Sequence, residues 1–288
     1  MAGIVPGIVG EIAGRLAGIE GVEAVALGGS LARGEGRPDS DVDIGIYYRK
    51  ENRPSVEDLR RLARELGARD PSNPDEPAPP PTDYGGWGPW IDGGAWLLIG
   101  GQHVDWLYRE IGRVSRFMEE CWAGRPEIHY QSGHPHGFHT HIYGGEVYHC
   151  DPLYDPGGVL RDLKQATEEY PPLLKRALIR TQLWEARFAL DTCRKPAARG
   201  DAFYVSGCLF RCAACMTQAL FALNERYLVN EKGAVAASES LPLRPDDFAE
   251  TVDAVLSGIG RHPESLSGSV RRLETLLERV EETCAGGL

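Results

Sequence analysis

The sequence predicts an α+β domain of α/β type, with a mixed and mostly antiparallel sheet, followed by an all-helical bundle domain. Two apolar runs within residues 22–48 alternate as strands do, and they flank a glycine-rich turn. From Tyr170 onward one helical pattern follows another with short connections, as in an antiparallel bundle. The turn-rich sequence DPLYDPGG lies between these regions. We therefore expect a first domain at residues 1–155 and a helical domain at residues 156–288.

The first domain is predicted to begin with a helix over residues 4–18, because apolar side chains recur there every four residues. Its further elements follow from alternation, capping and turn signals. They are strands at 22–29 and 41–48, a helix opened by Ser55 and Asp58 and ended by Gly67, strands at 95–101 and 103–109 joined through a Gly-Gly turn, and a helix at 111–122.

Residues 70–90 are rich in Pro, Gly and Asp, which indicates a long surface loop, and such loops are often functional. Trp87 and Trp90 near its end offer rings that can stack on a flat ligand, although packing against the domain is the commoner role of such side chains.

The second domain is predicted to contain four long helices, each with an apolar stripe of helical period. The first follows Pro171-Pro172, the second spans residues 202–228, and the third and fourth begin after Pro245 and Pro263. In the second helix, Cys208, Cys212 and Cys215 share one apolar face, which favours core packing over metal binding.

The strongest functional signal lies in ALGGSLARGEGRPDSDVDIGIYYR, residues 26–49. Asp41 and Asp43 share one face of the second predicted strand, because side chains alternate along a strand. Adjacent carboxylates repel each other unless a cation lies between them, and Mg2+ is a typical partner of such oxygen ligands. Gly28 and Gly29 let backbone N–H groups approach a phosphate, and Ser30 adds a hydroxyl near the start of a helix.

This arrangement resembles the nucleotidyltransferase superfamily typified by DNA polymerase beta. In that pattern Gly-Ser is followed by Asp-x-Asp on one strand and by a third carboxylate on another. Here Gly29-Ser30, Asp41 and Asp43 match, and the third carboxylate is Asp105 in GGQHVDWLYRE. The form Gly-Gly-Ser-x-Ala-Arg-Gly is especially similar to the small bacterial members, which include aminoglycoside, lincosamide and kanamycin nucleotidyltransferases and the nucleotidyltransferases of antitoxin systems. The resemblance covers residues 20–110.

The resemblance implies a metal-dependent transferase of the EC 2.7.7 type. It would move a nucleoside monophosphate, with AMP from ATP preferred over other nucleoside triphosphates, to a hydroxyl of a small molecule and release pyrophosphate. Asp41 and Asp43 would hold two Mg2+ ions, and Asp105 would complete the catalytic metal site or accept the hydroxyl proton. Gly29 and Ser30 would hold the phosphates. The acceptor would be an antibiotic or a biosynthetic intermediate.

Several other polar residues have two interpretations each. Arg33 is either a helix-surface residue or a triphosphate contact, and Ser40 either belongs to the nucleotide site or caps the turn before the strand. Glu146 and Glu185 are candidates for a general base by chemistry alone, and Glu146 is expected to follow a strand and a turn. An ordinary surface glutamate is the simpler interpretation of each.

Four histidines fall between His134 and His141 in GHPHGFHTH. His139 and His141 would share a face of a strand, which suits a metal ligand pair, but no cysteine or carboxylate set completes a zinc site. We expect a polar loop that lines the substrate cleft.

The charge and the cysteine content limit the classes of binding partner and the compartment that we expect. The net charge is −11, and up to Asp155 the chain has 14 Lys and Arg against 24 Asp and Glu, which argues against binding long nucleic acid. An acidic surface suits a cationic small substrate, although it also serves solubility.

Seven scattered cysteines indicate a reducing compartment. No run is expected to be long enough to span a membrane, and we expect a cytoplasmic protein without a membrane partner. The oligomeric state stays open.

Two other functions remain open. The first is adenylylation of a protein or of a tRNA end, as in toxin–antitoxin relatives; the added helical domain argues against a dependent antitoxin. The second is a nucleotide sensor without catalysis, against which the presence of all three aspartates argues. The two-part plan also resembles kanamycin nucleotidyltransferase and its relatives, in which a helical C-terminal domain helps form the substrate cleft.

Overall fold

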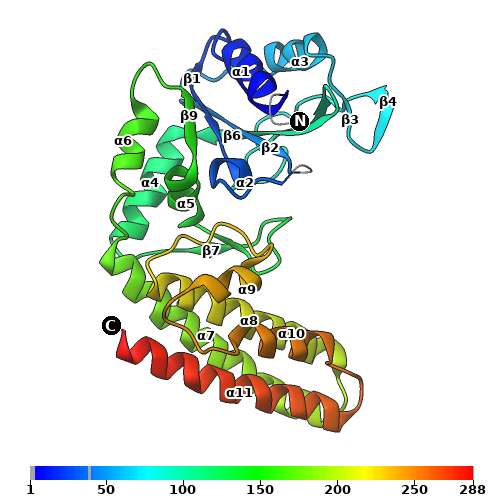
Figure 1. Cartoon of the computed structure of the whole chain (residues 1–288), viewed down its shortest axis with the longest axis vertical. Coiled ribbons are helices and arrows are strands. Elements are labelled where there is room, and N and C mark those ends of the chain that lie inside the picture. The colour runs from blue at the N-terminus through cyan, green and yellow to red at the C-terminus, as the bar shows by residue number, and fades with distance from the viewer. Residues whose placement is uncertain (1–3, 38–39, 288) are drawn as a thin grey trace. The chain divides into compact units, whose positions relative to one another are not determined.

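The computed structural model describes residues 4–37 and 40–287. By its contacts the chain divides into two compact units (Figure 1). The sheet unit contains the residues up to Glu119 together with 129–133 and 143–169, and the helical unit contains 120–128, 134–142 and the chain from Tyr170. The two units are interleaved in sequence. The domain limits expected at residues 155 and 156 stay a prediction.

The sheet unit is built on a seven-stranded sheet with one parallel pair. The strand order is β4 (Asn73–Pro77), β3 (Arg69–Asp70), β5 (Gly94–Ile99), β6 (Gln102–Glu110), β2 (Val42–Tyr48), β1 (Val22–Leu27) and β9 (Asp151–Tyr154). The pair β2–β6 is parallel, and the other neighbours are antiparallel. The predicted fold class, a mixed and mostly antiparallel sheet followed by helices, is confirmed.

One face of this sheet is covered by α1 (Ile4–Leu16) and α3 (Val56–Glu65), which lie next to each other in Figure 1. Their apolar sides meet the alternate residues of the central strands, so Ile44 and Trp106 are fully buried against Leu16 and Leu59. Ser55 caps α3 by accepting a hydrogen bond from the backbone N–H of Asp58, as the sequence predicts. Because β2 and β6 turn their apolar residues toward these helices, their intervening residues face the other side.

The opposite face is closed only in part. Near the C-terminal end of β2, Tyr47 packs in a small apolar cluster with Ala24, Ala26, Ile111, Cys150 and Leu160. Ile111 begins α4 (Ile111–Trp122), Cys150 directly follows α5 (Ile142–His149), and Leu160 lies in α6 (Val159–Gln165). Toward the N-terminal end of β2 the burial falls, and Asp43 is half-buried. A partly open area on this face therefore begins at Asp43.

Two expectations about local structure need correction. The loop expected at residues 70–90 contains the short hairpin β3–β4, although its strand residues are mostly exposed. Glu146 does not follow a strand and a turn but lies inside α5. Gly144 and Gly145 look like a turn signal, but Ile142, Tyr143 and Val147 are buried, and this packing stabilises the helix despite its low propensity.

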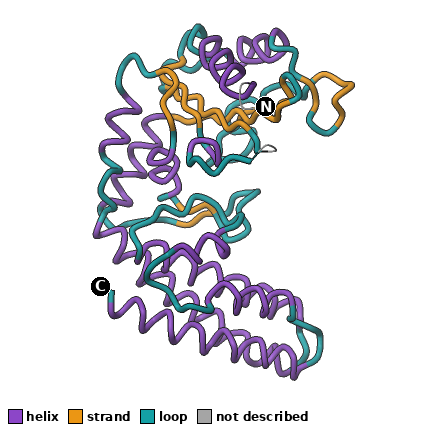
Figure 2. Tube along the Cα trace, in the orientation of Figure 1, coloured by secondary structure: helices purple, strands orange, loops and turns teal. Residues whose placement is uncertain are grey.

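The helical unit contains α7 (Pro172–Ala198), α8 (Ala202–Leu223), α10 (Phe248–Ser257) and α11 (Pro263–Gly286), as the apolar stripes predict (Figure 2). The short helices α9 (Ala234–Ala237) and η1 (Ser238–Ser240) connect α8 to α10. A two-stranded hairpin also forms, between β7 (Ile128–His129) and β8 (Phe138–His139).

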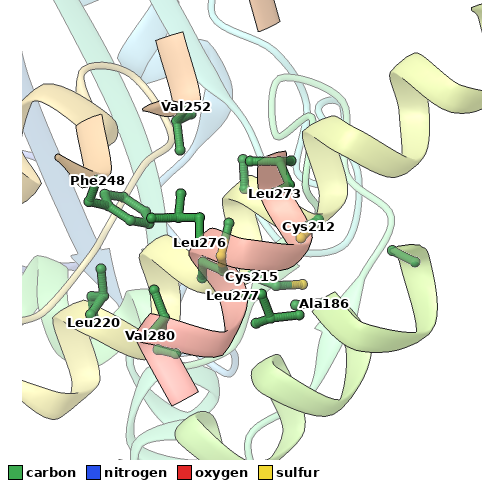
Figure 3. Packing of buried hydrophobic residues seen from close by; sticks show 14 of the residues in the cluster. Ala186, Cys212, Cys215, Leu220, Phe248, Val252, Leu273, Leu276, Leu277 and Val280 are labelled. Atoms are coloured by element: carbon green, nitrogen blue, oxygen red, sulfur yellow. The ribbon is translucent and has the colours of Figure 1, made fainter. Parts of the chain in front are cut away.

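The core of the helical unit lies where α8 and α11 meet α7 and α10 (Figure 3). Phe248 and Leu273 are fully buried there, and Cys212 and Cys215 are buried in the same apolar cluster. All seven cysteines are free. The interpretation of Cys212 and Cys215 as small core hydrophobes is confirmed.

One helix among the described residues, α8, is long and apolar enough to cross a membrane by length and composition. The expectation that no such run exists is therefore wrong. In the structure 67% of the apolar window is buried, and α8 contacts α7, α10 and α11. Its apolar composition is that of the central helix of a bundle, because it is covered by protein on most sides.

Candidate active site on the open face of the sheet

Asp43 and Asp105 stand directly opposite each other on neighbouring strands. The parallel ladder between β2 and β6 pairs Val42 with Val104 and Asp43 with Asp105. Paired residues of neighbouring strands turn their side chains to the same side, about 5 Å apart. Both aspartates are half-buried, on the face that α1 and α3 leave free. Asp105 therefore faces the same side of the sheet as Asp43, and its catalytic role stays a prediction.

The turn after β1 lies directly against Asp43. The backbone N–H of Gly28 donates to the carbonyl oxygen of Asp43 at 2.8 Å. Gly29 has a φ of +62°, and a Cβ atom built on it would lie 1.7 Å from Oδ2 of Asp43. Position 29 therefore requires glycine for two reasons: its left-handed backbone conformation, and the Asp43 carboxylate that occupies the place of a side chain. Ser30 follows in the short helix α2 (Gly29–Ala32) and is half-buried.

Asp41 lies one residue before β2 and is exposed. Gln102 holds the preceding backbone at the start of β6, because its Nε2 donates to the carbonyl oxygen of Ser40 at 2.7 Å. Within residues 4–37 and 40–287, no three His, Cys, Asp or Glu side chains gather in a way that could hold a metal ion. Asp41 is thus exposed outside the strand, whereas Asp43 and Asp105 are half-buried within their strands, and the convergence of the three carboxylates at one cleft stays a prediction. Their metal-binding role stays a prediction.

The donor set that the chain offers nevertheless suits a hard divalent cation. Asp43 and Asp105 present carboxylate oxygens on one face, and Asp41 precedes Asp43 by two residues. Oxygen ligands of this kind are typical of Mg2+ sites, which usually take one or two protein carboxylates together with substrate phosphates.

Arg33 and Ser40, which flank the candidate site in the sequence, both have local hydrogen-bond partners. Nε of Arg33 donates to Oε2 of Glu35 at 2.8 Å. The Ser40 hydroxyl accepts a hydrogen bond from the backbone N–H of Arg37 at 2.8 Å, so its role as a turn cap is confirmed. Contacts of Arg33 and Ser40 with a nucleotide stay predictions.

Trp96 extends the row of side chains beyond Asp105. In the antiparallel ladder between β5 and β6, Trp96 is the partner of Asp105. Trp96, Asp105 and Asp43 therefore lie side by side across three strands on one face. Sequence reasoning missed Trp96, although the two-residue turn at Gly100–Gly101 determines this pairing by counting back along the hairpin.

Glu146, a candidate general base, is held by a buried arginine. Nε and Nη2 of Arg109 donate to its two carboxylate oxygens at 2.8 and 2.7 Å. The Arg109 side chain is only 4% exposed. Burial alone would lower the pKa of Arg109, but the adjacent carboxylate of Glu146 raises it above its ordinary value. This geometry favours a structural ion pair, and the other candidate, Glu185, pairs with Arg211.

The histidines of the segment 134–141 are packed inside the helical unit. His136, His139 and His141 are at most 3% exposed, so the expected polar loop is wrong for these three. Nε2 of His139 lies 3.2 Å from Nδ1 of His136, and Nε2 of His136 lies 3.3 Å from Sγ of Cys215. Burial lowers the pKa of His139 to about 2 and that of His141 to about 4. These rings are neutral at pH 7.

A small, mainly apolar pocket of about 60 Å³ adjoins His136 in the helical unit. Thr217, Gln218 and Glu231 are its other polar lining residues. Glu231 accepts a hydrogen bond from the backbone N–H of His136 at 2.9 Å and lies 3.6 Å from Nδ1 of His134. The carboxylate of Glu231 thus serves first to anchor the histidine segment.

Two family models match parts of the chain. A family described as nucleotidyltransferase domain matches residues 9–75, which include the Gly28–Ser30 turn, Asp41 and Asp43. A second family, described as a domain of unknown function (DUF4037), matches residues 141–232. The chain thus carries a nucleotidyltransferase domain on its mixed sheet, followed by a helical region. Asp105 and Trp96 lie outside both matched segments.

Among solved structures, a nucleotidyltransferase-like protein from Exiguobacterium sibiricum 255-15 is similar to this chain at 12% sequence identity and a TM-score of 0.43. The similarity covers 97% of this chain and 76% of that one. A likeness of this degree does not bear on function. No curated protein matches the chain.

Proposed function

We propose that this protein is a nucleotidyltransferase that transfers AMP from ATP to a hydroxyl of a small molecule. The observation that carries the proposal is the register of Asp43 with Asp105, beside a turn in which Gly29 leaves room only for the Asp43 carboxylate. The match of a nucleotidyltransferase domain to residues 9–75 supports it.

The residues act in two groups. The backbone N–H groups of Gly29 and Ser30 and the Ser30 hydroxyl bind the triphosphate next to Asp43, while the N–H of Gly28 stays bonded to the carbonyl oxygen of Asp43. Asp41, Asp43 and Asp105 hold Mg2+, which supplies charge stabilisation for the oxygens of the reacting phosphate when it is bound. Arg33 and Ser40 lie in the segment between the turn and β2 and approach the triphosphate from there.

At the α-phosphorus the reaction forms one bond and breaks one, and one proton is transferred. The acceptor oxygen bonds to the α-phosphorus of ATP, and the bond from that phosphorus to the pyrophosphate oxygen breaks. The acceptor proton passes to the Asp105 carboxylate and then to solvent, and pyrophosphate leaves. Asp105 suits this role because it lies on the side of Asp43 away from the phosphate-binding turn.

The acceptor is a small molecule, either an antibiotic of the aminoglycoside or lincosamide type or a biosynthetic intermediate, in a cytoplasmic setting. The excess of acidic residues up to Asp155 supports a cationic acceptor, since it lowers the local potential.

The test uses ATP labelled at the α-phosphorus, Mg2+ and a panel of hydroxyl compounds that includes aminoglycosides and lincosamides. We expect label in a small-molecule product with equimolar pyrophosphate, and none with Asp43→Asn. Asp75→Asn, an exposed aspartate on β4, is the matched control and should behave as wild type. Label on protein or tRNA alone would establish the macromolecular alternative. Tight ATP binding without any transfer would indicate a sensor.

A further inference from the structure

We propose that Trp96, backed by Trp87, is the binding platform for a flat, apolar ring face of the acceptor. This inference rests on the proposed function and names the acceptor's chemistry: a hydroxyl compound with an aromatic ring or with the C–H face of a sugar. The observations that carry it are the register of Trp96 with Asp105, its exposure, and the fixed ring behind it.

Trp96 is unusually exposed for a residue of a paired strand. Its neighbours on β5, Ala95 and Leu97, are buried, whereas Trp96 is 59% exposed. A tryptophan ring has a large apolar surface, and its burial is favourable. A ligand that covers the exposed Trp96 ring therefore gains binding free energy.

One face of the Trp96 ring is already covered. Trp87 stacks on it with ring centroids 4.7 Å apart and an angle of 22° between the planes. Trp87 is itself held, because its carbonyl oxygen accepts a hydrogen bond from Nε2 of Gln131 at 2.6 Å and its N–H donates to the carbonyl of Asp92. Gly94 leaves room for it, since a Cβ there would lie 3.0 Å from the Trp87 ring. The platform is therefore preorganised, which lowers the entropic penalty of binding.

The order of groups across the sheet decides which substrate part reaches the platform. The Gly28–Gly29 turn contacts Asp43, Asp105 follows on β6, and Trp96 comes next on β5. The platform and the phosphate-binding turn thus lie on opposite sides of the two carboxylates. With the triphosphate at the turn, the molecule beside Trp96 is the one that attacks, and its ring stacks while its hydroxyl approaches Asp105.

Trp90 does not take part. It stacks on His129 at 3.8 Å between ring centroids and meets the edge of Phe117, so its ring is used in packing. Of the two loop tryptophans singled out in the sequence, Trp87 therefore contributes to the platform indirectly, and Trp90 stabilises the unit.

The variants separate ring stacking from strand structure. Trp96→Val removes the ring but keeps a residue suited to strands, and Trp96→Phe restores a flat ring. Trp184→Ala is the matched control, because Trp184 is 67% exposed but lies on α7 of the helical unit. Thermal unfolding of each variant reports any purely structural effect.

Binding is measured by saturation-transfer NMR and calorimetry with three probes at millimolar concentration: phenyl β-glucoside, methyl β-glucoside and benzyl alcohol. The first carries both kinds of ring, the second only the sugar, and the third only the aromatic ring. We expect wild type to bind phenyl β-glucoside, with the other two showing which face the platform prefers. Trp96→Val should weaken this binding about tenfold or more, as expected for loss of one ring-stacking contact, while Trp96→Phe and Trp184→Ala retain it.

The affinity for a nonhydrolysable Mg-ATP analogue is measured on the same variants. It should be unchanged in Trp96→Val. A tenfold loss there would place the nucleobase on Trp96 and overturn the proposal, as would equal binding of phenyl β-glucoside by wild type and Trp96→Val, or no binding of any probe by wild type. Absence of ATP binding by wild type would instead contradict the proposed function, so the two failures are distinguishable.

Discussion

Asp43 and Asp105 are partners in the one parallel strand pair of the sheet, and Gly29 presses its backbone against the Asp43 carboxylate. Two adjacent carboxylates are unfavourable without a cation between them, because like charges repel each other. In the proposed function, bound Mg2+ and the triphosphate offset this repulsion. The pairing of Asp43 with Asp105 is therefore the basis of the proposed nucleotidyl transfer.

Replacing either carboxylate by its amide should abolish most activity. Asp43→Asn and Asp105→Asn keep shape and remove one charge, and we expect each to lower turnover by at least ~100-fold, as for other charge-stabilising groups. Pyrophosphate release with an accepted hydroxyl compound measures this, with Asp75→Asn as the control. Near-normal turnover of Asp43→Asn would exclude the two-metal mechanism.

Gly29→Ala should prevent nucleotide binding while leaving the fold largely intact. The new Cβ would collide with Oδ2 of Asp43 and would strain a left-handed backbone. Gly34→Ala is a sharp control, because Gly34 also has a positive φ of +71° but has no atom within 4 Å of the place that a Cβ would take. Gly34→Ala should therefore show the backbone effect alone. Equal Mg-ATP affinity for both variants and wild type, measured by calorimetry, would reject the role of the turn.

Glu146→Gln should destabilise the sheet unit rather than remove a general base. The change leaves the buried Arg109 guanidinium without its full counter-charge, and breaking a buried pair costs about 3 kcal/mol. Urea unfolding measures the loss, and Glu57→Gln, in an exposed ion pair with Arg64, should leave stability unchanged. If Glu146→Gln instead keeps full stability and its pH–rate profile loses the fall in rate at low pH, Glu146 is the general base.

Acid should destabilise the helical unit well before its carboxylates titrate. In the folded chain the pKa of His139 is about 2 and that of His141 about 4, against 6.5 for an unburied histidine. Above about pH 6.5 both states are neutral and the histidines make no difference. As the pH falls from there, the unfolded chain binds protons that the folded chain cannot, and stability falls by about 1.4 kcal/mol per pH unit for each such histidine.

Thermal unfolding between pH 7.5 and pH 5 tests this histidine effect. His139→Gln should show a flatter dependence on pH than wild type, whatever its absolute stability. His262→Gln, which replaces an exposed histidine, should keep the wild-type slope. Parallel slopes for all three proteins would show that His139 is protonated in the folded state.

The sequence predicts well what depends on local alternation and short turns. Val42, Ile44 and Ile46 identify the buried side of β2, so the placement of Asp43 follows from the chain alone. The Gly100–Gly101 turn fixes the hairpin register and with it the pairing of Trp96 with Asp105. The parallel pairing of β2 with β6 joins segments some 60 residues apart, and only the resemblance to nucleotidyltransferases pointed to Asp105.

The structural features that the sequence does not predict depend on tertiary packing. The segment around Glu146 resembles a turn because of its two glycines, yet burial of Ile142 and Val147 makes it a helix. The histidines between 134 and 141 look like a polar loop, but His139 is buried beside His136, whose ring in turn contacts Cys215 of α8. In both cases the deciding factor is burial against the rest of the unit, which the local sequence pattern does not show.

The central claim is that Asp43 and Asp105 form a metal-dependent nucleotide site, and calorimetric titration with α,β-methylene ATP tests it without any acceptor. We expect wild type and Asp75→Asn to bind the analogue when Mg2+ is present and to lose that binding in EDTA. Asp43→Asn should bind at least about tenfold more weakly. Binding of equal strength in EDTA, or in Asp43→Asn with Mg2+, would contradict the claim.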